Sequence, residues 1–189
     1  MKTFLSFCAF TLLCISGVSA QTVTNYSTAD NLASSNPLAC VDLSEVTPDY
    51  SAADIFEGIK TCLKEKDFKK AVALYGIGAA YGVFDTRRVK DKTAHQAFSV
   101  LSMETFGTLD EESAELMKAE MDVLSNQENE TRPAFCSALK KIGPPEYHPT
   151  YMISHGMGAF TGSDGNGLVE DFDSEAVWND VIKNYMKCN

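Results

Sequence analysis

Apolar residues recur at helical spacing through most of this chain, and that periodicity constrains the fold more than any other feature. After Ser51, for example, Ile55, Phe56, Ile59 and Cys62 fall on one face of a helix. Similar apolar stripes follow along the chain. We expect helix N-caps at Ser51, Asp67, Thr108, Thr131 and Ser174, and a further helix from Ala94 to near Gly107. The sequence therefore predicts an all-α fold, a compact bundle of five to seven helices.

The same stripes predict which side chains form the core. The expected core includes Phe56, Ile59, Phe68, Tyr75, Phe98, Leu101, Leu139 and Trp178. Gly82 is expected to end the second helix, since a glycine after an apolar stripe is typical of a C-cap. A Gly/Pro-rich stretch from Gly143 to Asp173 interrupts the helical pattern, and Leu168-Val169 within it could form a short strand.

The first 20 residues have the pattern of a secretory signal peptide. Lys2 supplies the positive charge, residues 4–15 are mostly apolar, and Val18-Ser19-Ala20 is a small-residue cleavage site. We expect a signal peptide at 1–20, an N-terminal strap at 21–50 and one helical domain at 51–189. No later apolar run reaches about 18 residues, so no membrane insertion is expected after cleavage. The predicted location is therefore the periplasm or the outside of the cell.

Four cysteines remain once the signal peptide is removed, and an even number in an exported chain favours disulfides. They are Cys40, Cys62, Cys136 and Cys188. Three pairings are possible. Cys40–Cys62 with Cys136–Cys188 is favoured, because each bond would then tie a terminal segment to a nearby helix. Asn25-Tyr-Ser and Asn129-Glu-Thr match the N-glycosylation pattern, which has a meaning only in a glycosylating host.

The net charge of the chain is strongly negative and argues against nucleic acids as partners. It is −10 for the whole sequence and −11 once Lys2 is removed. Lys and Arg form no long cluster, so the electrostatic attraction to phosphate backbones is missing. Anionic membrane surfaces are disfavoured for the same reason.

Residues 51–84 resemble a single tetratricopeptide unit. The resemblance rests on Cys62, Phe68, Ala71 and Tyr75, which alternate small and large residues where two antiparallel helices interlock. It implies a helix-turn-helix hairpin inside the bundle, and no second copy follows at a spacing of 34 residues. The whole chain is also similar to exported, uncharacterised helical proteins of Gram-negative bacteria, a resemblance that implies no activity.

The Gly/Pro-rich stretch concentrates the residues that could recognise a ligand. The candidate binding residues are Tyr147, His148, Tyr151, His155, Asp164, Glu170, Asp171 and Asp173. Two imidazoles near carboxylates could also bind zinc or act as acid and base, but their spacing of seven residues across Pro149 does not favour it. A calcium loop from Asp164 lacks an oxygen ligand at its fifth position, which is Leu168. We therefore assign no catalytic residue, no metal ligand and no cofactor.

Three function classes follow from these observations. The leading interpretation is an exported, non-enzymatic helical protein that binds another protein, such as a periplasmic immunity or inhibitor-type protein. Its recognition surface is expected to include the segment from Tyr147 to Asp173. The alternatives are a small periplasmic hydrolase that uses the His148/His155 region and a structural component of the envelope. The sequence leaves the partner and the oligomeric state open.

Overall fold

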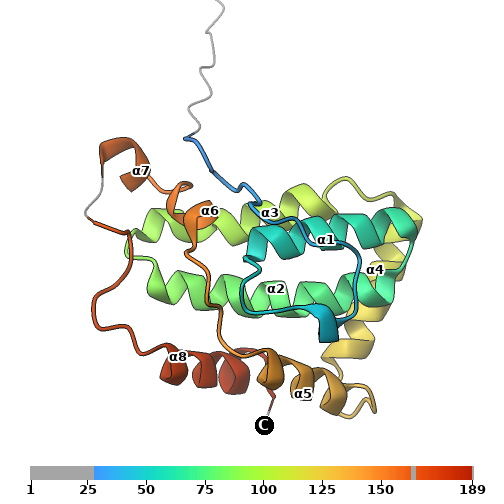
Figure 1. The fold of residues 1–189 in the computed structure, drawn as a ribbon. Helices are drawn as coiled ribbons and strands as arrows, with labels where there is room; N and C mark the ends of the chain where they lie inside the picture. Colours follow the sequence, from blue (N-terminus) through green and yellow to red (C-terminus); the bar gives the residue numbers. More distant parts are fainter. Residues whose placement is uncertain (1–27, 163–164, 189) are drawn as a thin grey trace, which may run out of the picture.

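The computed structural model describes residues 28–162 and 165–188, and this part of the chain is all-α (Figure 1). Its α-helices are α1 (Ala52–Glu65), α2 (Phe68–Arg88), α3 (Ala97–Phe106), α4 (Glu111–Ser125), α5 (Arg132–Ile142), α6 (Thr150–Ile153), α7 (Gly158–Thr161) and α8 (Ser174–Asp180). Two short 3₁₀ helices, η1 (Leu43–Glu45) and η2 (Lys92–Gln96), precede α1 and α3, and a π-helical turn, η3 (Val181–Tyr185), follows α8. The predicted signal peptide and residues 21–27 of the strap lie outside the described residues.

Helix α2 is the centre of the bundle. In Figure 1 it lies between α1 and α3 on one side and α5 and α8 on the other, while α4 crosses one end. Its middle is rich in small residues, so neighbouring helices approach it closely. Of the predicted core, five side chains are buried: Phe56, Ile59, Leu101, Leu139 and Trp178. The other three, Phe68, Tyr75 and Phe98, are partly buried and pack against that core.

Helix α1 begins as its sequence predicts, with Ser51 as N-cap. The Ser51 hydroxyl accepts from the Asp54 N–H at 3.1 Å, and the Asp54 carboxylate accepts from the Ser51 N–H at 2.8 Å. Asp54 also accepts from the Ser34 hydroxyl and the Asn36 N–H. One buried carboxylate thus starts α1 and holds the strap onto it.

Helix α2 is longer than the sequence predicts, because Gly82 does not end it. The helix continues to Arg88, and a Cβ at Gly82 would lie 2.4 Å from Cδ2 of Phe98. The glycine is therefore needed for the close approach of the Phe98 ring rather than for a left-handed C-cap. This correction adds Asp85 and Arg88 to the helix.

Three smaller expectations about the elements are also corrected. The N-cap of α4 is Asp110 rather than Thr108, because the Asp110 carboxylate accepts from the Ser113 N–H at 2.7 Å. The N-cap of α8 is Asp173 rather than Ser174. Instead of a strand at Leu168-Val169, the described residues contain one isolated antiparallel bridge between Val89 and Leu168.

Both predicted disulfides are present, Cys40–Cys62 and Cys136–Cys188. The first ties the strap to α1, and the second ties the chain after η3 to α5. Two disulfides fit an oxidising compartment of the kind exported proteins enter. Within the described ranges, no helix combines the length and the apolar character that crossing a bilayer requires.

Candidate functional site

The segment 143–173, expected to carry recognition, leaves the bundle after α5 and returns to it at α8. It contains two single-turn helices, α6 and α7, and four glycines with positive φ, which are Gly143, Gly162, Gly165 and Gly167. The bridge to Leu168, with Val169 N–H donating to the Arg88 carbonyl at 2.8 Å, fixes its return to the end of α2. The segment therefore has an inner part that contacts α2 and an outer part around α7 (Figure 1).

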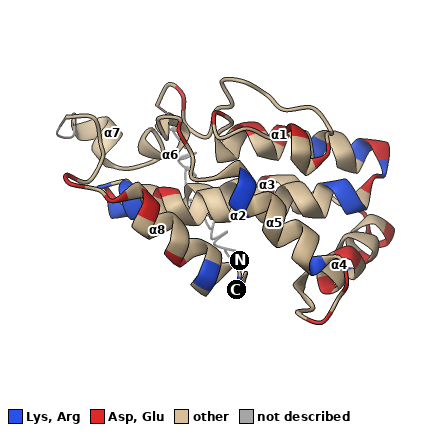
Figure 2. Ribbon diagram, turned by 60° about the horizontal axis from the view of Figure 1, so that its bottom comes forward, with Lys and Arg blue, Asp and Glu red and all other residues tan. Residues whose placement is uncertain are grey.

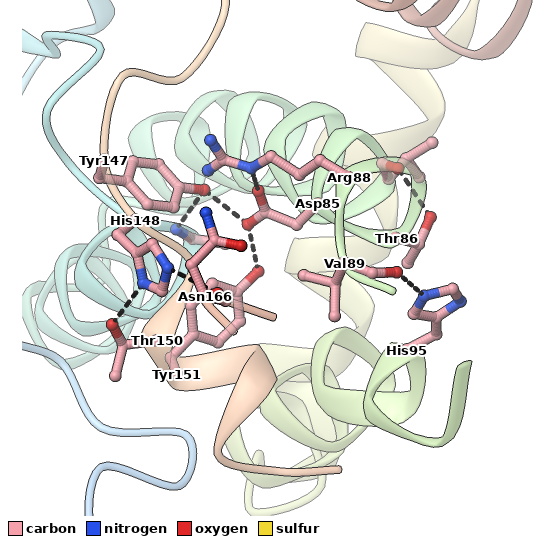
Figure 3. Close-up of polar contacts among 12 residues, drawn as sticks. Asp85, Thr86, Arg88, Val89, His95, Tyr147, His148, Thr150, Tyr151 and Asn166 are labelled. Carbon is pink, nitrogen blue, oxygen red and sulfur yellow. Dashed lines mark hydrogen bonds and ion pairs between the residues drawn. The ribbon is translucent and has the colours of Figure 1, made fainter. Parts of the chain in front are cut away.

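A buried carboxylate, Asp85 of α2, anchors the inner part. Figure 3 shows two tyrosines and an arginine converging on it. The hydroxyls of Tyr147 and Tyr151 donate to Asp85 Oδ2 at 2.8 and 2.7 Å, and Arg88 Nε donates to Oδ1 at 2.7 Å. The Tyr147 hydroxyl also accepts from the Ala52 N–H at 3.2 Å, which links the segment to the start of α1.

The Asp85 cluster is too deeply buried to serve a substrate. Asp85 has no exposed surface, and the Arg88 guanidinium lies over the Tyr147 ring at 4.8 Å. Burial raises the pKa of Asp85, while Arg88 and the two tyrosine hydroxyls favour its charged form. Burial and the nearby Asp85 charge raise the pKa values of both tyrosines well above their usual range. We interpret the cluster as a structural anchor.

The histidines bond to amide, hydroxyl and carbonyl groups. His148 is exposed and contacts the Thr150 hydroxyl and the Asn166 carbonyl, both at 3.0 Å (Figure 3). His155 contacts the side-chain oxygen of Asn31 in the strap at 2.9 Å. In residues 28–162 and 165–188, no group of three or more His, Cys, Asp or Glu side chains is placed to hold a metal ion. Among the described residues, neither His148 nor His155 is hydrogen-bonded to a carboxylate.

Asp91, which the sequence analysis did not single out, fixes the outer part. Its carboxylate accepts from the Gly158 N–H at 2.7 Å, and the Thr93 hydroxyl accepts from the Met157 N–H at 2.8 Å. A Cβ at Gly156 would lie 2.4 Å from Asp91 Oδ2, so only glycine allows this approach. Hydrogen bonds from Thr93 and Gly158 lower the pKa of Asp91. The single turn of α7 is thereby held to the start of η2.

The outer part presents three large apolar side chains to solvent. Met157 is 61% exposed, Phe160 47% and Val169 41%. We call these three residues, together with the exposed acids Glu170 and Asp171, the outer patch. Figure 2 shows acidic residues on the chain that leads from this region into α8. Val169 adjoins the two acids in the chain, and an exposed apolar side chain next to acidic ones can contact a partner surface of opposite charge.

The structure divides the predicted binding residues into several groups. Tyr147 and Tyr151 meet at Asp85, with Tyr151 only 2% exposed, so they do not form a surface. Asp173 caps α8 by accepting from the Ala176 N–H at 2.9 Å. His148, Glu170 and Asp171 remain exposed, and Asp164 lies outside the described residues.

Comparisons of the chain with protein-family models, with curated proteins and with solved structures found no match. The functional argument therefore rests on the geometry of this molecule.

Proposed function

We propose that this protein is an exported, non-enzymatic protein that binds another protein through the outer patch. In its specific form the proposal is an immunity or inhibitor-type protein of the periplasm, whose patch covers a basic site on its partner. The buried Asp85 cluster supports this proposal indirectly, since it anchors the segment that carries the outer patch.

The observation that carries the proposal is the exposure of Met157 and Phe160 on a turn whose backbone is fixed by Asp91 and Thr93. A backbone that is already positioned loses little conformational entropy when a partner covers it. Aromatic residues that become fully buried are frequent binding hot spots. Both properties favour recognition over a purely connecting role.

Charge supports a basic partner. The chain has 26 acidic and 16 basic residues, and Glu170 and Asp171 lie beside Val169 in the outer patch. Long-range attraction would speed the encounter with a positively charged protein and would weaken as salt increases.

The direct experiment is a pull-down from the envelope fraction of the producing cell with a Met157→Ser/Phe160→Ser variant beside the wild type. Met103→Ser is the matched control, since Met103 is 64% exposed and belongs to α3 rather than to the segment 143–173. We expect the wild type and Met103→Ser to retain a partner that the double variant loses. All three proteins should unfold within about 0.5 kcal/mol of each other, because the substitutions are on the surface.

Retention of every recovered partner by the double variant would place binding elsewhere. Failure of the wild type to retain any protein would favour the structural envelope component instead.

A second variant, Glu170→Lys, tests the charge. It is preferable to a lysine at Asp171, whose φ of 53° is unfavourable for a long side chain, and to Asp173, which caps α8. We expect slower association with the recovered partner and a smaller dependence on salt. An unchanged association rate at low salt would show that these acidic residues do not contribute to binding.

A further inference from the structure

A second region, on the other side of the bundle from α7, has the features of a small-molecule site. A pocket of about 420 Å³ lies between α2, α4, α5 and the chain after η3. That volume is within the range of about 300–1,000 Å³ typical of ligand sites. In Figure 1, α4 lies at the opposite end of α2 from α7.

The walls of the pocket are mainly apolar. Helix α2 contributes Val72 and Ala79, α4 contributes Met121 and Leu124, and α5 contributes Phe135. The Phe135 ring packs onto α2 where Gly76 leaves room, since a Cβ there would lie 2.5 Å from Cζ of Phe135. An aliphatic or aromatic body would therefore be well accommodated.

The charged residues of the lining are both basic. They are Arg132 and Lys187, and no Asp or Glu lines the pocket, although the chain as a whole has a net charge of −10. This local excess of positive charge in an acidic protein is the feature that points to an anion.

Arg132 is buried without a counter-charge. It is 8% exposed; its Nη1 donates to the Leu124 carbonyl at 3.0 Å, and its Nη2 donates to the Met186 carbonyl. Its buried Nε has no hydrogen-bond partner, and no carboxylate lies within ion-pair distance of its guanidinium among the residues the structure describes. A buried cation with an unsatisfied donor is costly unless something pairs with it.

We propose that this pocket binds a small amphipathic carboxylate, such as a fatty acid, with its head group on Arg132 and its apolar body between α2 and α4. A carboxylate matches the planar donors of a guanidinium, with which it can form a two-point contact. Lys187 at the rim adds a second positive charge. The flexible side chain of Met121 adapts the wall to chains of different shape.

The test is a calorimetric titration of the folded protein with dodecanoate, with dodecyltrimethylammonium as the cationic counterpart. We expect saturable binding of one dodecanoate per chain and no comparable binding of the cation. Arg132→Met should weaken dodecanoate binding about tenfold or more, because it removes a charge-assisted hydrogen bond. Lys183→Met is the matched control, since Lys183 is exposed on η3 outside the lining, and it should bind as the wild type does.

A second variant, Ala79→Leu, fills the pocket and leaves Arg132 in place. It should also weaken binding, whereas the Met157→Ser/Phe160→Ser variant should not, so failure here is distinguishable from failure of the outer patch. The proposal is overturned if the wild type shows no saturable binding of dodecanoate. Equal affinity of Arg132→Met and the wild type, or equal binding of the cation, would overturn it as well.

Discussion

Arg88 and Arg132 are both 8% exposed, yet they stand in different surroundings. Arg88 pairs with Asp85 at 2.7 Å and lies against the rings of Phe84 and Tyr147. Arg132 has the ring of Phe135 at 5.5 Å and two backbone carbonyls as acceptors, and it borders the pocket. Burial lowers the pKa of Arg132.

The difference between the two arginines indicates different roles. Where the chain supplies the counter-charge, a buried arginine holds the fold together, and here it fixes the segment that carries the outer patch. Where the chain does not supply it, a ligand can do so. The predictions below test that distinction, from the largest expected effect to the smallest.

Asp85→Ala should give the largest loss of stability. It leaves Arg88 buried without its carboxylate and removes the acceptor of two tyrosine hydroxyls, so the free energy of unfolding should fall by about 3–5 kcal/mol. Urea denaturation measures it. The control is Asp180→Ala, whose ion pair with Arg87 spans 2.6 Å on the surface and should contribute less than about 1 kcal/mol. Similar losses in the two variants would contradict the structural role of Asp85.

Removing each disulfide in turn should show which of the two bonds supports the pocket. Replacing both cysteines of either bond by alanine should cost about 2–4 kcal/mol, more for Cys136–Cys188, because it closes the longer loop. Only that variant should also weaken dodecanoate binding, since Cys188 holds the chain that presents Met186 and Lys187. An equal effect of both variants on binding would contradict the placement of the site.

Gly76→Ala should lower the free energy of unfolding by less than the disulfide variants do. The substitution lies on the side of α2 that faces the pocket. The new Cβ would displace the Phe135 ring, with a cost of about 1–3 kcal/mol. Gly78→Ala in the same helix is the control, because its Cβ would meet Ile55 Cγ2 at 3.3 Å, a tight contact that a small shift can relieve. Thermal unfolding of both variants measures the difference. If Gly78→Ala were as unstable as Gly76→Ala, the loss could not be attributed to the close contact between Gly76 and the Phe135 ring.

The smallest effect concerns pH and the base of the outer patch. The pKa of Asp91 is lowered in the folded protein, so its bonds to Thr93 and Gly158 contribute fully above the ordinary value of about 3.9. That contribution is lost as the pH falls through the lower folded value. An NMR titration of the Asp91 carboxyl and the Gly158 amide should give one midpoint below 3.9. A midpoint at or above that value would contradict the hydrogen bond between Asp91 and the Gly158 N–H of α7.

The elements of the fold could be predicted from sequence wherever burial on one side of a helix sets the pattern. The stripe after Ser51 and the two disulfides are examples. The sequence alone does not assign Gly82, because a glycine after an apolar stripe can serve either as a C-cap or as the point where another ring approaches closely. Thr108 and Asp110 both suit the start of α4, and the hydrogen bond that forms decides between them.

The Asp85 cluster and the Arg132 pocket were harder to predict from the sequence than the helices. Asp85 and Arg88 are three residues apart, a spacing that predicts a pair once α2 is known to extend that far. Their partners Tyr147 and Tyr151 lie 62 and 66 residues away from Asp85, and no local pattern connects them. The sequence around Arg132 does not predict a binding site either, because the pocket forms only when four separate elements pack together.

The most direct test of the account compares the free energies of unfolding of Arg88→Met and Arg132→Met, measured without ligand. Arg88→Met leaves Asp85 buried without its cation and should cost about 3–5 kcal/mol. Arg132→Met removes a charge that has no counter-charge in the described part of the chain, and water in the pocket can hydrate the two carbonyls it leaves. Its cost should be smaller, about 1–3 kcal/mol, because only these two hydrogen bonds are lost. An equal, large loss in both variants would show that Arg132 also serves the fold, and would contradict the distinction drawn between them.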